Sequence, residues 1–259
     1  MTGRFTNRIA VIAGGGAGIG RRFAHRFAGE GASVVIADLD IGAAKRVVAE
    51  LAADGARGLA CAADVADVEA VSAMASAAVA EFGGIDILVN CAAIHLDHAQ
   101  LPFDLESVPK WRQVMDVNVV GTLACSAACR PAMAARGGGS IVNMSSMAAY
   151  GASGAYGVSK LAVNSLTVSL AAAYSADGIR VNGIAPGLVD SESAVEWAND
   201  PSRSGAADIQ EQLVAGQMIK RPGRMDDLAN LCLFLSSAEA GFITGQTILV
   251  DGGYTKKPY

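Results

Sequence analysis

Seven short apolar runs recur along the chain, separated by longer alanine-rich segments with helical spacing. Runs that are apolar at consecutive positions are typical of strands buried on both faces of a parallel sheet, and helices usually connect such strands. The runs are Ile9–Ala13, Ser33–Asp38, Gly58–Ala62, Ile87–Asn90, Ile141–Met144, Arg180–Ile184 and Thr247–Val250. The pattern predicts an α/β fold, a doubly wound, parallel, seven-stranded sheet with helices on both faces, in a single domain over residues 1–259.

Charge and cysteine content argue against several classes of function. The formal net charge is −5 and the basic residues are scattered, so we expect no nucleic-acid partner. The five cysteines lack the spacing of a zinc or redox motif, so we expect reduced, buried thiols and no metal. No stretch approaches the roughly 20 apolar residues of a membrane span, and the first run is too short for a signal peptide. A cytoplasmic protein with no membrane partner is therefore expected.

The first apolar run leads into a glycine-rich turn and then into a helical segment. The turn reads Gly14-Gly15-Gly16-Ala17-Gly18-Ile19-Gly20, and the helical pattern continues from Arg21 to Glu30. Glycines allow close approach of the backbone, so that free N–H groups at a helix N-terminus can face a pyrophosphate. We therefore expect a dinucleotide-binding turn, with the spacing Gly-x-x-x-Gly-x-Gly rather than Gly-x-Gly-x-x-Gly.

Asp38 ends the second run, where a carboxylate can accept hydrogen bonds from the adenosine ribose hydroxyls. A 2′-phosphate there would meet like charge, and at about 4 Å the repulsion is ~1 kcal/mol in water and ~4 kcal/mol at a protein surface. No Lys or Arg stands in the turn, at Ala37 or at Leu39 to offset it. The sequence thus favours NAD(H) over NADP(H). The neighbouring Asp40 is expected to cap the helix that starts near Ile41.

A second candidate site follows the fifth run. Tyr156 and Lys160 are four residues apart at the start of a long helical segment, so their side chains share one helical face. Lowering a tyrosine pKa from about 10 to near 7 requires about 4 kcal/mol, which one close ammonium in a dry site can supply. With Ser145 and Ser146 just upstream, the spacing indicates a tyrosine that transfers protons.

Together these features resemble the short-chain dehydrogenase/reductase family, and the resemblance extends from Ile9 to Gly253. The segments that carry it are the turn Gly14 to Gly20, Asp64-Val65, Asn90-Cys91-Ala92-Ala93, Asn118-Val119-Val120-Gly121, Ser146, Tyr156 with Lys160, and Pro186-Gly187. The resemblance implies a Rossmann fold and an NAD(H)-dependent oxidoreductase that interconverts a secondary alcohol and a ketone by hydride transfer. It also implies a homotetramer, in which the helical segments Trp111–Arg136 and Ala155–Ala176 pack against copies of themselves.

The resemblance further implies roles for individual residues. Tyr156 is expected as general acid/base, Ser146 as a hydrogen-bond donor to the substrate oxygen, and Asn118 as support for a proton-relay water. Lys160 is expected to lower the pKa of the tyrosine and to hold the nicotinamide ribose, while Ser145 is the alternative catalytic serine. The implied cofactor contacts are Gly14, Ala17, Gly18, Ile19, Gly20, Asp38, Leu39, Asp64, Val65, Asn90, Ala92, Tyr156, Lys160, Pro186, Gly187, Val189 and Ser191.

Residues 188–220 break the alternation of strands and helices. They carry no strand signal and only weak helical periodicity, and they follow Pro186-Gly187 at a strand end, where ligand sites of such sheets lie. We expect a substrate lid here. The chain departs from the family pattern at Ala13, Ala93 and Ser191, and its segment between Ser146 and Tyr156 is three residues shorter than usual, which implies a differently shaped substrate entrance.

Two other functions remain as alternatives. One is a 3-oxoacyl-thioester reductase, whose extended substrate would meet the basic residues Lys220, Arg221 and Arg224 near the lid. The other is a non-catalytic NAD-binding sensor. The presence of the serine, tyrosine, lysine and asparagine together argues against the sensor, because a buried phenol and ammonium are costly without a function or a partner.

Several single residues have two interpretations. His95 and His98, with Asp97 between them, fit a solvated loop better than a metal site. Trp197 and Met218 either cover an apolar substrate or pack within the lid. Asp64 either lies beside the adenine or caps the helix that begins near Val68.

Overall fold

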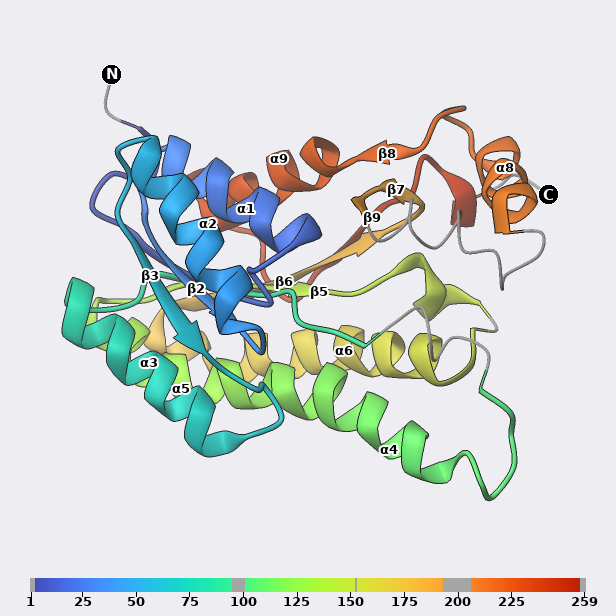
Figure 1. Ribbon diagram of the computed structural model, residues 1–259, viewed down its shortest axis with the longest axis horizontal. Helices are drawn as coiled ribbons and strands as arrows, with labels where there is room; N and C mark the ends of the chain where they lie inside the picture. The colour runs from blue at the N-terminus through green and yellow to red at the C-terminus, as the bar shows by residue number, and fades with distance from the viewer. Residues whose placement is uncertain (1–2, 95–100, 152, 193–205, 257–259) are drawn as a thin grey trace.

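The computed structural model describes residues 3–94, 101–151, 153–192 and 206–256. All seven predicted strands form one parallel sheet in the order β3-β2-β1-β4-β5-β6-β9 (Figure 1). Their bounds are β1 Ile9–Ala13, β2 Ser33–Asp38, β3 Gly58–Ala62, β4 Ile87–Asn90, β5 Gly139–Met144, β6 Ile179–Pro186 and β9 Thr247–Val250. The order reverses beside β1, which pairs with β2 through Val11↔Val35 and with β4 through Val11↔Leu88. Such a switch point opens a crevice at the carboxyl ends of the strands.

Helices cover both faces of the sheet, as the apolar runs predicted (Figure 1). One face carries α1 (Gly18–Gly29), α2 (Ile41–Ala53) and α9 (Met225–Ser236), and the other carries α3 (Val68–Phe82), α5 (Gly121–Ala135) and α6 (Gly154–Ala173). Side chains of β1 alternate between the two layers: Ile12 belongs to the first core and Val11 to the second. Two apolar cores therefore sandwich the sheet, and its carboxyl edge is left to build a site.

Aspartate side chains cap the N-termini of α2 and α3. Asp40 accepts hydrogen bonds from the backbone N–H of Gly42 at 2.8 Å and of Ala43 at 3.1 Å, so its predicted capping role is confirmed. Helix α3 is capped by Asp67 and not by Asp64. The Asp64 carboxylate accepts from Ala66 N in the turn before that helix, because the cap must directly precede the first helical residue.

The structure corrects the prediction at two segments. The segment Trp111–Arg136 is divided into α4 (Val108–Met115), a π-helical turn (Asp116–Val120) and α5. The predicted lid, residues 188–220, contains the two-residue strand β7 (Val189–Asp190) and helix α8 (Ala206–Gly216), and a second two-residue strand, β8 (Gly223–Arg224), follows the lid. The predicted absence of strands in the lid was wrong at β7, because a two-residue strand is too short for a pattern. His95, Asp97, His98 and Trp197 lie outside the described residues.

Two further expectations concern the burial of the cysteines and the presence of membrane-spanning helices. All five thiols are free; Cys125, Cys129 and Cys232 are buried, whereas Cys61 and Cys91 are partly exposed, which corrects the expectation that every thiol is buried. Within the described part of the chain, no helix is both long enough and apolar enough to cross a membrane.

Candidate active site

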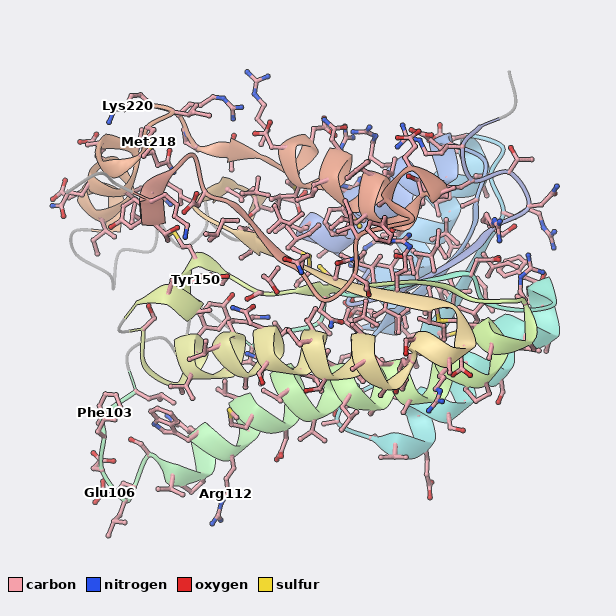
Figure 2. All side chains as sticks on the ribbon, turned by 180° about the vertical axis from the view of Figure 1, so that it is seen from behind. Phe103, Glu106, Arg112, Tyr150, Met218 and Lys220 are labelled. Atoms are coloured by element: carbon pink, nitrogen blue, oxygen red, sulfur yellow. The ribbon has the colours of Figure 1, made fainter. Side chains whose placement is uncertain are left out.

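A cavity of about 530 Å³ at the carboxyl edge of the sheet brings the two halves of the sequence together. This size suits a small-molecule ligand. The predicted residues that line it are Gly14, Ala17, Gly18, Ile19, Gly20, Ser146, Tyr156, Lys160, Pro186, Gly187, Val189 and Ser191. The cavity thus joins the glycine turn to the serine, tyrosine and lysine. At the same end of the molecule Figure 2 labels Tyr150, which lies after β5, and Met218, which follows α8.

The glycine turn has the geometry of an anion cradle. Gly18 has a φ of +52° and open space where a side chain would stand, so its backbone is free to approach a ligand. Gly20 lies so close to the turn that a Cβ there would be 2.0 Å from the carbonyl oxygen of Gly14. Helix α1 begins at Gly18 and directs its free N–H groups and the positive end of its dipole toward the cavity.

Asp38 is held against the same turn. Its carboxylate accepts hydrogen bonds from Gly16 N at 2.8 Å and from Asp40 N at 3.0 Å, and a Cβ on Gly16 would lie 2.7 Å from Asp38 Oδ2. The turn and the end of β2 therefore fit each other only with glycine at position 16. Neither Asp38 nor the exposed Leu39 lines the cavity, so both stand beyond its rim on the β2 side.

Four further predicted cofactor contacts lie outside the cavity lining. Asp64 holds its turn, and Val65 is buried against α5, where a Cβ on Gly121 would lie 2.7 Å from its Cγ2. Asn90 is buried and donates to Asn143 Oδ1 at 2.9 Å. Ala92 N donates to Ala13 O at 2.8 Å, which holds the end of β4 beside the turn.

Ser146 and Tyr156 meet in the cavity. Ser146 begins the 3-10 turn Met147–Tyr150, where its Oγ accepts from Ala148 N at 3.1 Å, and it also hydrogen-bonds Tyr156. The preceding Ser145 is buried and its hydroxyl donates to the carbonyl of Lys160, so the two serines differ in their partners. Burial raises the pKa of Tyr156 to about 12, although the bond with Ser146 acts in the opposite direction.

The Lys160 ammonium is buried and donates to the carbonyl oxygen of Met144 at 2.7 Å. It lies 5.6 Å from the centre of the Tyr156 ring, and burial lowers its pKa to about 8. The expectation that Lys160 lowers the pKa of Tyr156 therefore stays a prediction. The ammonium is turned toward the end of β5, so desolvation dominates the pKa of both groups.

Asn118 lies in the π-helical turn and is 1% exposed. Its Oδ1 accepts from Ile94 N at 2.8 Å, and its Nδ2 donates to Ile94 O and to Ser159 Oγ, both at 2.9 Å. Ser159 precedes Lys160 on α6, so the amide ties the segment after β4 to the helix that carries the tyrosine and the lysine. π-helical turns of this kind are frequent at functional sites.

Other residues line the cavity although they are not among the predicted cofactor contacts or the first-choice catalytic residues. They are Cys91, Ala93, Met144, Ser145, Met147, Leu188, Glu192, Gln210 and Leu213. For the residues that follow β4 and β5, position directly after a strand could have predicted a place in the site, because residues after parallel strands gather at the carboxyl edge of the sheet. Gln210 and Leu213 belong to α8, and nothing in the local pattern indicated that this helix faces the cavity.

The chain is similar in sequence to known dehydrogenases and reductases over nearly its whole length. The model of a family described as enoyl-(acyl carrier protein) reductase matches residues 14–255. A probable short-chain type dehydrogenase/reductase of Bradyrhizobium diazoefficiens is 44% identical, and the alignment covers 97% of this chain and 88% of that protein. A cis-4-hydroxycyclohexanecarboxylate dehydrogenase of Sinomonas cyclohexanicum is 38% identical, with 97% of this chain and 98% of that protein covered.

A solved structure has nearly the same fold. It is a 7α-hydroxysteroid dehydrogenase complexed with NADH and 7-oxo glycochenodeoxycholic acid, and it is 35% identical to this chain. The superposition has a TM-score of 0.88 and covers 96% of this chain and 95% of the other. The likeness thus extends to sequence and fold over nearly the whole described chain.

Proposed function

The chain belongs to the short-chain dehydrogenase/reductase family, and on that premise we propose that it is an NAD(H)-dependent oxidoreductase that interconverts a secondary alcohol and a ketone. Membership of the family supports an oxidoreductase of the short-chain dehydrogenase/reductase type; the cofactor and the reaction are the finer proposal. The observation that carries the finer proposal is the shared cavity, in which Ser146, Tyr156 and Lys160 face the glycine turn. A hydride carrier held by that turn would have its reactive end beside the tyrosine.

The residues present fit a nicotinamide dinucleotide. The open backbone at Gly18 and the N-terminus of α1 suit a pyrophosphate, and Asp38 stands where it could accept from ribose hydroxyls. Pro186, Gly187, Val189 and Ser191 form the opposite wall, and Lys160 at the floor could donate to the second ribose. The NADH in the related 7α-hydroxysteroid dehydrogenase supports the same choice, and the Asp38 carboxylate disfavours a 2′-phosphate.

The proposed chemistry assigns a proton step to this chain. When bound, the nicotinamide supplies or accepts the hydride. In the reductive direction Tyr156 Oη gives its proton to the carbonyl oxygen, which becomes the alcohol oxygen, and Ser146 Oγ donates a hydrogen bond to the same oxygen. In the oxidative direction the proton returns to Tyr156. A raised tyrosine pKa keeps the proton donor loaded at neutral pH.

The structure weakens the support for the alternatives. Lys220 donates to the carbonyl oxygens of Ala215 and Gln217, and Arg221 pairs with Asp227 at 2.7 Å. These basic groups hold the end of α8 and the start of α9, which argues against a patch kept for an acyl carrier. The assembled serine, tyrosine and lysine argue against a sensor that has lost its chemistry.

We also infer the homotetramer that the family resemblance implies. Apolar side chains on the outer faces of two long helices support it, because Leu123 of α5 and Val158, Leu161 and Val168 of α6 are all more than 40% exposed.

The test is a turnover assay with a panel of neutral secondary alcohols and ketones, each offered with NAD(H) or NADP(H). Turnover is followed as the change in absorbance of the reduced nicotinamide. Tyr156→Phe should lower kcat/KM by about 10²–10⁴-fold, because it removes the proton donor. The matched control is Tyr150→Phe, since Tyr150 is exposed and lies outside the cavity lining. Equal losses in both variants would contradict the role of Tyr156, and a preference for NADP(H) would contradict the role of Asp38.

A further inference from the structure

The segments around β7 and β8, which flank helix α8 and are called the lid roots here, meet in a small parallel sheet. Strand β7 follows β6 directly, and β8 lies just before α9; they pair through Val189↔Gly223 and Asp190↔Arg224. Gly223 N also donates to Leu188 O at 2.8 Å. Because Leu188 and Val189 line the active-site cavity, the position of this sheet sets the position of one cavity wall.

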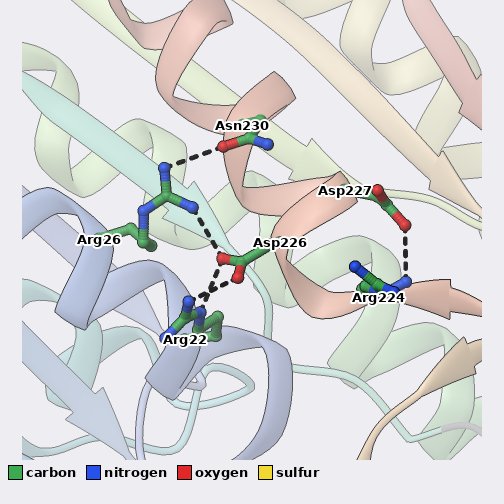
Figure 3. Close-up of polar contacts among 6 residues, drawn as sticks. All are labelled: Arg22, Arg26, Arg224, Asp226, Asp227 and Asn230. Atoms are coloured by element: carbon green, nitrogen blue, oxygen red, sulfur yellow. Dashed lines mark hydrogen bonds and ion pairs between the residues drawn. The ribbon is translucent and has the colours of Figure 1, made fainter.

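A carboxylate just beyond β8 reaches across to the helix that carries the glycine turn (Figure 3). Asp226 accepts two hydrogen bonds from Arg22, from Nε at 2.9 Å and from Nη2 at 2.6 Å, and one from Arg26 Nη1 at 2.7 Å. Arg26 also donates to Asn230 Oδ1 at 2.9 Å. The paired contacts from one guanidinium fix direction as well as distance.

Farther along the two helices, α1 and α9 pack against each other in the first core, but packing is incomplete where α1 begins, and the polar contacts matter there. A second cavity of about 400 Å³ separates the start of α1 from the lid roots. It is lined by Gly18, Arg21, Arg22, His25, Asp190, Arg224, Met225 and Asp226. Where apolar side chains do not fill the space between two elements, the hydrogen-bonded ion pairs that bridge it set their separation.

The other lid root is bridged to the same helix. Glu192, two residues after β7, lies 3.8 Å from Arg21, which also pairs with Glu50 on α2 at 2.8 Å. Glu192 lines the active-site cavity. Consecutive arginines at the start of α1 therefore contact the two roots of the lid, Arg21 at the root after β7 and Arg22 at the root after β8.

We propose that Arg22, Arg26 and Asp226 are positioning residues that hold the glycine turn at a fixed separation from the lid roots and thereby set the affinity for the dinucleotide. The inference rests on the proposed function. A dinucleotide that touches both the turn and the wall behind Val189 binds best at one separation of the two, because small displacements of a binding group cost affinity. The ion pairs are partly exposed, with side-chain exposures of 38% for Arg22 and 44% for Asp226, so their removal should change global stability little.

The first measurement needs no cofactor. Hydrogen–deuterium exchange of residues 188–192 and 220–224 is compared in wild type, Asp226→Asn and the control Asp177→Asn, which breaks the Arg130–Asp177 pair on the other face of the sheet. We expect faster exchange in both lid roots for Asp226→Asn alone. Unchanged exchange, or the same change in Asp177→Asn, would overturn the proposal.

The second measurement is NADH affinity by fluorescence titration, followed by steady-state kinetics. Asp226→Asn should raise the Kd for NADH by about fivefold or more, while kcat at saturating cofactor changes by less than about twofold. The pair Arg22→Met and Asp226→Asn should be non-additive, because both variants break the same contact. Asp226→Glu should recover most of the affinity. Additive effects, or a fall in kcat without a change in Kd, would contradict the proposal.

The measurements distinguish failure of the proposed function from failure of the positioning role. If wild type does not bind NADH, the proposed function is wrong, and the exchange comparison still decides whether the ion pairs hold the lid roots. If wild type binds NADH and Asp226→Asn binds it equally well, the proposed function stands and the positioning role is wrong.

Discussion

The buried ammonium of Lys160 links a single residue to the stability of the fold. It is 3% exposed, and burial lowers its pKa from 10.5 to about 8. Between these values the unfolded chain keeps a proton that the folded chain has released, so the unfolded state binds more protons and stability rises with pH. The contribution is fully present above pH 10.5 and is lost as pH falls through 8.

Replacing Lys160 by Met should remove this pH dependence. We expect the free energy of unfolding of wild type, minus that of Lys160→Met, to rise by about 2 kcal/mol between about pH 8 and pH 10. The range ends below the titration of Tyr156, whose pKa is raised to about 12. Urea unfolding followed by circular dichroism at a series of pH values checks it. A constant difference would mean that the folded ammonium keeps its proton.

At the scale of elements, helix α1 begins where its backbone lies close against the glycine turn. Its third residue, Gly20, has the carbonyl of Gly14 where a side chain would stand, whereas Gly29, its last residue, has open space around it. The same residue type thus meets opposite requirements at the two ends of one helix.

Alanine at these two positions should therefore act in opposite directions. Gly20→Ala should lower the free energy of unfolding by about 1–3 kcal/mol, because backbone atoms block the new methyl group. Gly29→Ala should raise it by about 0.5–1 kcal/mol, because alanine favours the helix and nothing blocks it. Denaturant unfolding of both variants gives the comparison, and a loss of stability in Gly29→Ala would refute the steric argument.

At the scale of the whole molecule, a buried carboxylate joins segments from across the sequence at the sheet edge opposite the cavity. Asp86 is 2% exposed and accepts hydrogen bonds from Arg8 at 2.8 Å, Arg136 at 2.9 Å and Ile9 N at 2.9 Å. Two cations and a backbone amide thus depend on one anion, which holds the starts of β1 and β4 and the end of α5.

Removing this charge should destabilise the fold without changing the site. Asp86→Asn is expected to lower the free energy of unfolding by about 2–4 kcal/mol, because a buried charged hydrogen-bond network loses its anion. Glu81→Gln is the control, since Glu81 pairs with Arg57 on the surface and should contribute less than about 1 kcal/mol. Thermal unfolding and kcat measured well below the transition separate stability from activity. A fall in kcat at that temperature would show that the effect reaches the cavity.

Much of the site could be predicted because its signals are local. Steric or periodic patterns mark the glycine turn, the acid at the end of β2, and the tyrosine and lysine four residues apart. The glycine turn, Tyr156 and Lys160 contribute to the cavity lining, whereas Asp38 does not. Asp64, Val65, Asn90 and Ala92 came from the family resemblance and lie outside the cavity lining. Their predicted contact with a cofactor stays a prediction.

The sequence by itself determined the seven strands, the parallel sheet and the Asp40 cap of α2, because apolar period and side-chain capping act over a few residues. Only the tertiary structure decided that Lys160 turns to Met144 O, that α8 contributes Gln210 and Leu213, and that the lid roots pair. Arg22 and Asp226 are 204 residues apart, and either could have paired with many other surface charges. The path of the folded chain selects such partners, because an ion pair between distant segments has no sequence period and forms only where the fold brings the two charges together.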